Sequence, residues 1–341
     1  MEGQSFKQAS KQASISYLRI VATICVVFLH TCSTLTDNPN LFILSNTQRV
    51  FFTASYQSMY WAVPVFFMIT GALLLEKDLS YTDILRRYVK RMIIVLLVFG
   101  FGFAIIKTYA TTKMINFTLL CQSLVAVIED TGFGHMWYIY VLIGIYLMMP
   151  LLSLIAKLEK STVKGILIVL FVFDFCIPLL NKLLGMSIAF SVPIAYPLFY
   201  FIFGYYLNKY TGLRIVRSTV AIIFGVVVIV MTNIFNFNPD AISSYNSPII
   251  VLIAFGMFSL FVNLKLKNEK EFVWKIDRLC FGVYLVHQFF IQTAYRFIGC
   301  NPSRFKLYPL ATFFFFVVFV GVAFISSMCM SKIKPLKKYV L

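Results

Sequence analysis

Long apolar runs recur along the chain, separated by short polar and basic segments. An apolar helix of about 17 residues or more can cross a hydrocarbon core of roughly 30 Å. The pattern predicts ten spanning helices, at about 15–35, 50–75, 88–110, 135–156, 162–181, 191–208, 214–235, 247–264, 273–297 and 308–330. Pro64 is expected to kink the second span. Pro193 and Pro197 interrupt the sixth, a break that neighbouring helices in a membrane tolerate.

Composition supports a membrane protein. Only 13% of the 341 residues are charged, whereas about 25% are charged in a typical soluble domain. The chain is therefore predicted to be an all-α integral membrane protein, with one bundle over 1–341 and short tails at 1–14 and 331–341. The first apolar run is too long for a cleavable signal peptide and carries no small-residue cleavage site. The shorter apolar segment 114–128 predicts a helix lying on the outer membrane surface.

The basic residues are divided unevenly between the two sides of this bundle. With the N-terminus inside, 22 lysines and arginines fall in cytoplasmic segments and 7 in outer ones. This bias is typical of multi-pass membrane proteins and favours ten spans with both termini cytoplasmic. The net charge of +17 does not indicate nucleic-acid binding, because the cations lie in short loops. The seven cysteines form no CxxC pair, and the spacing of the three histidines supports no metal site.

The first predicted span carries one arginine and one histidine, Arg19 and His30, eleven residues apart. Eleven residues are about three helical turns, so both side chains share one face, roughly 16 Å apart along the axis. Ionisable groups inside a spanning helix are costly and often mark a functional pathway. His30 suits general base work on a hydroxyl, although a structural hydrogen bond would also explain it. Arg19 has either a functional role or a structural one, in which its side chain only extends to the nearby inner edge of the membrane.

Other polar residues in or beside the spans also have a functional and a structural interpretation. The basic run after the second span contains Arg86, Arg87, Lys90 and Arg91. These cations either bind phosphate groups or form a charge cluster that stops translocation of the chain through the membrane. Further candidates, for contacting a substrate or supporting the catalytic histidine, are His135, Trp137, Tyr140, Tyr146, Asp174, Tyr284 and His287. For the aromatic members, packing and an interfacial belt are the favoured interpretation. Asp174 would orient a histidine, pair with a cation or stay protonated.

Several of these residues form an ordered series of motifs. The series is Arg19 and His30 with ten residues between them, Pro64-Val-Phe-Phe-Met-Ile-Thr-Gly71, the basic run ending at Arg91, His135-Met-Trp137-Tyr-Ile-Tyr140 with Tyr146 and Pro150, Phe-Gly204-Tyr-Tyr, and Gly282-Val-Tyr284-Leu-Val-His287. In this order and spacing, the chain resembles the membrane acyltransferase-3 family of bacterial integral-membrane O-acyltransferases. The resemblance extends from the first predicted span to the ninth.

The resemblance implies a ten-helix bundle in the bacterial cytoplasmic (inner) membrane. Such a bundle takes an acyl group, acetyl above all, from cytoplasmic acyl-CoA and passes it to a hydroxyl of a cell-surface polysaccharide or lipid-linked saccharide. His30 matches the family's catalytic histidine, while Arg19 and Arg91 match arginines tied to activity or donor binding. No permanently bound cofactor or metal is implied, because acyl-CoA is a donor substrate. The expected partners are the saccharide acceptor, the lipid bilayer and polysaccharide-synthesis machinery.

The chain departs from the family pattern at two positions. Val95 stands where a proline often follows the basic run, and Thr70 replaces the usual serine before Gly71. Neither departure removes a group that the chemistry needs. Two other function classes fit the same composition: a transporter or flippase for a saccharide or small solute, and a non-catalytic membrane subunit of a glycan synthase. No inverted repeat, the usual mark of many transporters, is evident.

Overall fold

The computed structural model describes residues 2–113, 115–131, 134–188, 190, 196–210, 215–264 and 271–341, and the side chains of all of these except 2–12 and 111. In these residues every regular element is a helix. The α-helices are α1 (Glu2–Thr36), α2 (Asn46–Gln57), α3 (Ala62–Leu74), α4 (Tyr81–Asp83), α5 (Lys90–Val95), α6 (Phe101–Thr112), α7 (Phe117–Ile128), α8 (Trp137–Leu147), α9 (Met149–Leu152), α10 (Lys160–Phe171), α11 (Ile177–Leu184), α12 (Tyr196–Tyr210), α13 (Ile215–Ile234), α14 (Pro239–Ile242), α15 (Pro248–Asn263), α16 (Glu271–Gln292), α17 (Tyr308–Lys332) and α18 (Lys334–Tyr339).

Six helical stretches in the described part of the chain are long and apolar enough to cross a membrane. They are Ala13–Thr36, Asn46–Leu74, Tyr81–Ala110, Lys160–Leu184, Ile215–Ile234 and Tyr308–Lys332. A seventh is added if Gly134–Leu147 and Met149–Lys157, which meet at a bend of 60°, form one broken span. The all-helical membrane bundle is therefore confirmed, whereas the count of ten and the cytoplasmic ends stay predictions.

The other predicted spans also fall on helices, but length or charge separates these helices from the six. The α12 and α15 helices have 15 and 16 residues, so each is only about 24 Å long or less at 1.5 Å per residue. The α16 helix is long enough, but its first two turns carry charged residues such as Lys275, Asp277 and Arg278. The start of the sixth predicted span at 191–195, including Pro193, lies outside the described residues.

The second predicted span differs from its expected shape. The chain leaves the helix at Ser58 and resumes it at Ala62, before Pro64. Pro64 lies in the first turn of α3. In a continuous helix its ring would clash with the carbonyl four residues earlier, at Tyr60. The interruption at 58–61 therefore lies where Pro64 is expected to disturb the span, and it is a break in the helix.

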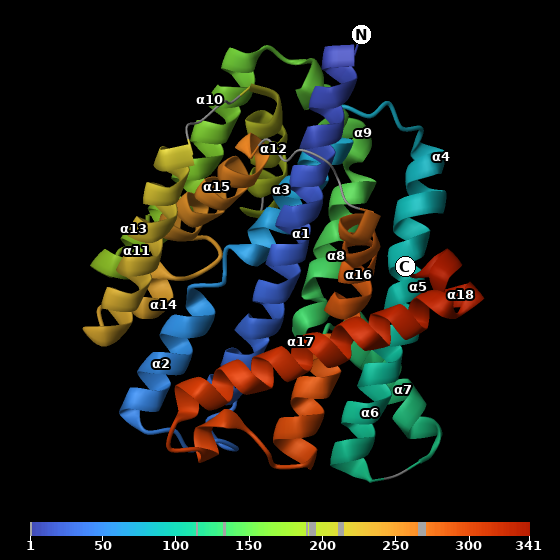
Figure 1. The fold of residues 1–341 in the computed structure, drawn as a ribbon, viewed down its shortest axis with the longest axis vertical. Coiled ribbons are helices and arrows are strands. Elements are labelled where there is room, and N and C mark those ends of the chain that lie inside the picture. The colour runs from blue at the N-terminus through green and yellow to red at the C-terminus, as the bar shows by residue number, and fades with distance from the viewer. Residues whose placement is uncertain are drawn as a thin grey trace.

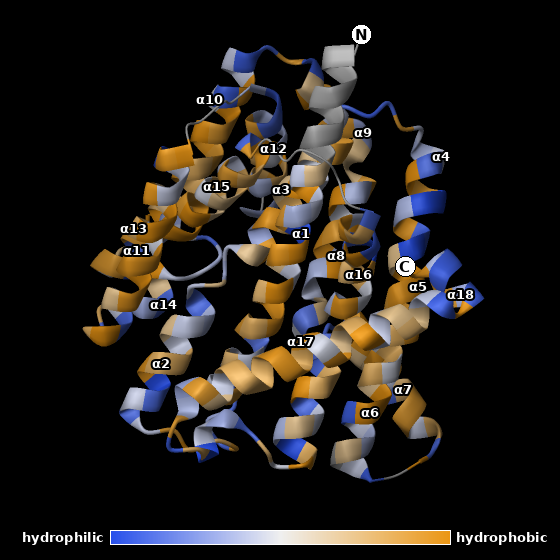
Figure 2. Ribbon diagram, viewed as in Figure 1, coloured by the Kyte–Doolittle hydropathy of each residue, from blue (hydrophilic) through white to orange (hydrophobic). Residues whose placement is uncertain are grey.

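The bundle places α1 at its centre (Figure 1). The α10, α11 and α13 helices lie on one side of α1, α4 to α7 lie on the other, and α17 crosses the lower half of the view. Hydrophobic residues cover α10, α13 and α17, while hydrophilic residues gather on α4 and α18 (Figure 2). Phe313 and Phe314 of α17 are 60% and 63% exposed. Such a contiguous apolar surface is typical of a face that lies against lipid.

Two glycines let α3 and α12 pack backbone against backbone. A methyl group placed on Gly71 would overlap the carbonyl oxygen of Phe201, and one on Gly204 would overlap the backbone of Met68. Small residues at such crossings allow membrane helices to approach closely. This joint holds the two helices together beside α1.

Candidate active site

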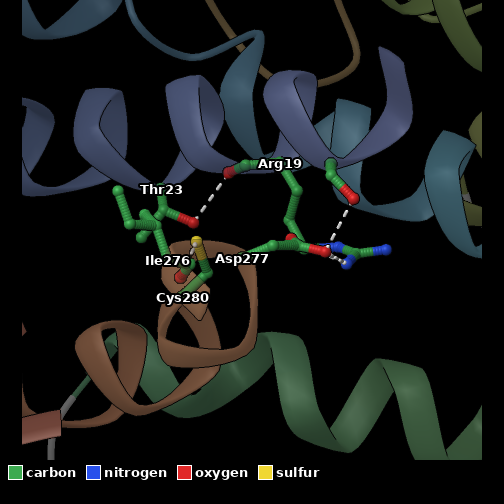
Figure 3. Close-up of polar contacts among 6 residues, drawn as sticks. Arg19, Thr23, Ile276, Asp277 and Cys280 are labelled. Atoms are coloured by element: carbon green, nitrogen blue, oxygen red, sulfur yellow. Dashed lines mark hydrogen bonds and ion pairs between the residues drawn. The ribbon is translucent and has the colours of Figure 1, made fainter. Parts of the chain in front are cut away.

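An ion pair joins α1 to α16 at one end of the site (Figure 3). Nη1 of Arg19 donates to both carboxylate oxygens of Asp277, at 2.8 and 2.7 Å, and the Ser16 hydroxyl donates to the same carboxylate at 2.9 Å. Sequence reasoning passes over Asp277. The signal that would have found it is its place in the ninth predicted span, ten residues before His287, which mirrors the place of Arg19 eleven residues before His30.

A cavity of about 460 Å³ opens beside this pair. Its lining includes Arg19 and Asp277 together with three further cations, Lys77, Arg91 and Arg278. Four cations and one carboxylate in one cavity favour a ligand with several negative charges. Aromatic and apolar side chains complete the wall, among them Phe66, Tyr88, Tyr138, Leu142, Tyr146 and Tyr284.

The structure brings only one of the three candidate donor-binding arginines to this cavity. The Arg91 guanidinium lies 5.1 Å from the ring centroid of Phe281 and donates to the backbone oxygens of Val340 and Leu341, at 2.8 and 2.6 Å. Arg87 is 73% exposed and pairs with Asp83 at 3.2 Å. Arg86 is also exposed and is absent from the cavity lining.

The three histidines meet further along the same helices. The ring centroid of His287 lies 5.1 Å from that of His30 and 5.2 Å from that of His135, and the remaining pair is 6.2 Å apart. His30 comes from α1, His287 from α16, and His135 from the 3-10 turn Gly134–Met136 that precedes α8. His135 and His287 are buried, whereas His30 is half-buried. Among the described residues no group of three metal-ligating side chains is placed to hold a metal ion.

Tyr284 forms the partition between the cavity and the histidines. Its ring lines the cavity, and its hydroxyl donates to the carbonyl oxygen of His135 at 2.6 Å. Its own carbonyl oxygen lies 2.7 Å from Nδ1 of His287. The cationic cavity and the histidine cluster are therefore adjacent, and Tyr284 contacts both.

The other candidates from the sequence have separate positions. Tyr140 donates its hydroxyl proton to the carbonyl of Val127 and so ties α7 to α8. Tyr146 lies in the cavity wall, with its ring centroid 5.2 Å from that of Tyr88. Asp174 lies in a π-helical stretch between α10 and α11, and no described residue bonds to its Oδ2. The structure does not bring Asp174 to the histidine cluster.

An aromatic group extends from the histidine end of α8. Tyr245 lies 5.6 Å from Trp137, 4.5 Å from Tyr60 and 6.4 Å from Tyr196, measured between ring centroids. The ring plane of Tyr245 is nearly parallel to that of Tyr196, with an angle of 11° between them. Trp137 was a candidate from the sequence, but Tyr60, Tyr196 and Tyr245 were not. No periodic pattern marks them, because they belong to three separate segments.

Beside this group is a polar network that joins α2 to α13 and α14. The side-chain amide of Asn233 donates to Oε1 of Gln57 at 2.7 Å, and Gln57 in turn lies 3.4 Å from the carboxylate of Asp240. Gln57 and Asn233 are buried. Along the chain, Gln57 lies three residues before Tyr60, and Asp240 lies five residues before Tyr245.

Comparison with protein families identifies the chain. The family model described as an acyltransferase domain matches residues 12–328, nearly the whole chain. The chain belongs to the acyltransferase-3 family. This membership supports membrane acyltransferase activity in general. Comparison with curated proteins and with solved structures finds no match.

For an acyltransferase-3 protein, the two connected regions have complementary chemistry. The cavity offers positive charge for an anionic donor, and the histidine cluster offers nitrogen bases that accept a proton. The two departures from the family pattern leave both regions intact. Thr70 lines the cavity and donates its hydroxyl proton to the carbonyl of Phe66 at 2.7 Å, while Val95 is fully buried in the core.

Proposed function

We propose that this chain is an O-acyltransferase that takes an acyl group, acetyl first, from acyl-CoA and transfers it to a saccharide hydroxyl. One observation carries the proposal: a cavity lined by four cations shares Tyr284 with a cluster of three histidines. The donor would bind in the cavity and the acceptor would approach the histidines from the aromatic side.

The donor site follows from charge and distance. Acyl-CoA is a polyanion, and Arg91, Lys77 and Arg278 line the cavity with Arg19. Arg91 would exchange its two backbone oxygen partners for phosphate oxygens, which form stronger charge-assisted hydrogen bonds. The unbroken helix α1 places His30 roughly 16 Å along the axis from Arg19. The pantetheine arm of CoA is long enough to carry the thioester over that distance.

His30 is the proposed general base. Its half-buried ring accepts the proton of the acceptor hydroxyl while the hydroxyl oxygen attacks the thioester carbonyl carbon. The carbon–sulfur bond then breaks, and the proton on His30 passes to the departing sulfur, so that free CoA leaves as its thiol. No redox partner or metal is needed for this balance.

The acceptor class is inferred from the aromatic group of Tyr60, Trp137, Tyr196 and Tyr245. Aromatic faces pack against the apolar face of a sugar ring, and the nearby amides and carboxylate of Gln57, Asn233 and Asp240 suit sugar hydroxyls. A glycan or lipid-linked saccharide fits both features. Machinery that synthesises the polysaccharide is the expected partner.

The ten-span topology is part of the same proposal. Two contacts in the same order, Arg19 with Asp277 and His30 with His287, show that α1 and α16 run parallel. If both cross the membrane, an odd number of spans lies between them. The spans at 46–74, 81–110, 134–157, 160–184 and 215–234 make five, and adding α12 and α15 makes seven. Five gives eight spans in total and seven gives ten, and both counts put the two termini on the same side of the membrane. The proposal is the ten-span bundle, with both termini cytoplasmic in a bacterial inner membrane.

The test uses the purified protein in lipid nanodiscs, with radiolabelled acetyl-CoA and an extract of lipid-linked saccharides from the producing cell. We expect label to enter the saccharide fraction with wild type and to fall at least about 10²-fold in His30→Ala, the order of loss typical when general base catalysis is removed. Cys25→Ala, on the same helix, is the control. Unchanged transfer by His30→Ala would refute the assignment of the base.

The two rival functions predict other results. A transporter would move saccharide across a proteoliposome membrane without any CoA thioester. A synthase subunit would copurify with a glycosyltransferase and release no CoA. Either result, from protein shown to be folded, would overturn the enzyme proposal.

A further inference from the structure

The chemistry above uses one histidine of the cluster and leaves the role of His287 open. Its side chain is fully buried, at 0% exposure, in the second half of α16. A buried imidazole needs hydrogen-bond partners, and the partners that it has decide which of its nitrogens carries the proton.

The proton of His287 is on Nδ1. This nitrogen lies 2.7 Å from the carbonyl oxygen of Tyr284 and 3.2 Å from that of Val283, both one turn earlier on the same helix. A carbonyl oxygen only accepts, so Nδ1 must be the donor. In the neutral ring Nε2 then carries the lone pair and is an acceptor.

In the structure Nε2 of His287 is buried and makes no hydrogen bond with a described residue, so a donor reaches it only if a neighbouring ring turns toward it. Two rings lie near enough to supply a donor, His30 and His135, with centroids at 5.1 and 5.2 Å. His135 already interacts with the backbone of Leu285. The ring of His30 forms no hydrogen bond within the described part of the chain, so it has an N–H to give.

We infer that His287 is a positioning residue, whose Nε2 accepts the N–H of His30 and thereby leaves the other nitrogen of His30 free to take the acceptor's proton. This rests on the proposed function, in which His30 is the base. Without a partner, the His30 ring is free to turn and to carry its proton on either nitrogen. With His287 behind it, one tautomer faces the substrate, and the same hydrogen bond becomes charge-assisted once His30 holds two protons.

Two substitutions separate this role from simple packing. The amide oxygen of His287→Gln reaches about as far as Nε2 and keeps an acceptor facing His30. The shorter His287→Asn keeps a donor for the carbonyl of Tyr284 but places nothing where Nε2 was. Asparagine is smaller than glutamine by one methylene, and thermal unfolding of the two variants measures this extra loss of packing separately from kcat.

The experiment measures acetyl transfer, the KM for acetyl-CoA, and the thermal shift caused by free CoA, for wild type, His287→Gln and His287→Asn in nanodiscs. We expect His287→Asn to lower kcat by 10²-fold or more, with KM and the CoA shift within twofold of wild type. His287→Gln is expected to restore kcat to within tenfold of wild type. If the asparagine variant does not fold, His287→Leu takes its place, since it also lacks an acceptor.

Equal loss of kcat in the glutamine and asparagine variants, with the CoA shift intact, would overturn the inference. So would full activity in His287→Asn. These outcomes differ from failure of the proposed function, in which wild type itself transfers no acyl group from any CoA thioester. As a further control, His135→Leu removes the competing donor, since leucine has no N–H to give. If His135→Leu loses as much kcat as His287→Asn, and the double variant loses no more than either, the partner of Nε2 is His135 and the role for His30 is refuted.

Discussion

The ion pair between Arg19 and Asp277 is predicted to be worth far more than a surface pair. Two unit charges about 4 Å apart interact by about 4 kcal/mol at an effective dielectric constant of about 20. The Asp277 side chain is 5% exposed and that of Arg19 is 29% exposed, so solvent screens part of this energy. We therefore expect a coupling of about 2 kcal/mol, well above the roughly 0.2–1 kcal/mol of exposed pairs.

A double-mutant cycle measures that coupling. The cycle uses Arg19→Gln, Asp277→Asn and the double variant, with the free energy of unfolding taken from denaturant titration in mixed micelles. Asp277→Asn keeps the shape of the side chain and removes its charge, while Arg19→Gln removes the charge and leaves a shorter polar side chain. The pair formed by Glu271 and Lys275 on the same helix is the control, because these side chains are 83% and 67% exposed. Its coupling is expected to be about 0.5 kcal/mol or less.

The reasoning fails if the two cycles give the same coupling. It also fails if Asp277→Asn alone is neutral, since that variant leaves Arg19 beside an uncharged group and replaces one of its two acceptor oxygens by an NH2 donor. A coupling well above about 4 kcal/mol would mean that the site is drier than its 29% exposure implies.

Two further predictions concern the donor cavity and the glycine joint. Free CoA at a hundred times its dissociation constant should stabilise wild type by about 2.7 kcal/mol. We expect thermal unfolding to show that Arg91→Ala loses most of this stabilisation and that Arg87→Ala keeps it. Equal shifts in the two variants would contradict the donor site. Gly204→Ala forces a methyl group into the backbone of Met68, so it should destabilise by at least about 1–3 kcal/mol. Gly144→Ala, with open space around it, is the control, and size-exclusion profiles of the two variants would tell them apart.

The helical bundle could be predicted from the sequence because bilayer thickness imposes a length on every spanning segment. Periodicity also placed Arg19 and His30 on one face of one helix, and the unbroken α1 confirms the shared helix. Pro64 indicated an interruption of the second span, and the break lies at 58–61, in the turn before this proline. The exact ends of the break were not predictable, because the turn has no proline or glycine of its own.

The site itself was predictable only in part. The sequence shows three histidines in apolar segments, but their meeting depends on how α1, α8 and α16 pack, which no local pattern encodes. For the same reason the sequence could not show which arginines of the basic run line the cavity and which are exposed. Arg91 lies about one turn further along the helix than Arg87, and at that position the side chain lines the cavity, whereas Arg87 is exposed. Asp277 was not among the candidates, although it lies in the ninth predicted span, because no local pattern pairs it with Arg19 of the first span.

The joint between α3 and α12 has a genetic consequence. At most helix contacts, an enlarged side chain can be accommodated by trimming the one opposite, so compensating pairs of substitutions arise. Opposite Gly71 and Gly204 there is only main chain, from Phe201 and Met68. No single replacement elsewhere can create the missing space, because every amino acid has the same carbonyl group. A selection for second-site suppressors of Gly71→Ala or Gly204→Ala should therefore return true revertants far more often than compensating substitutions at this contact.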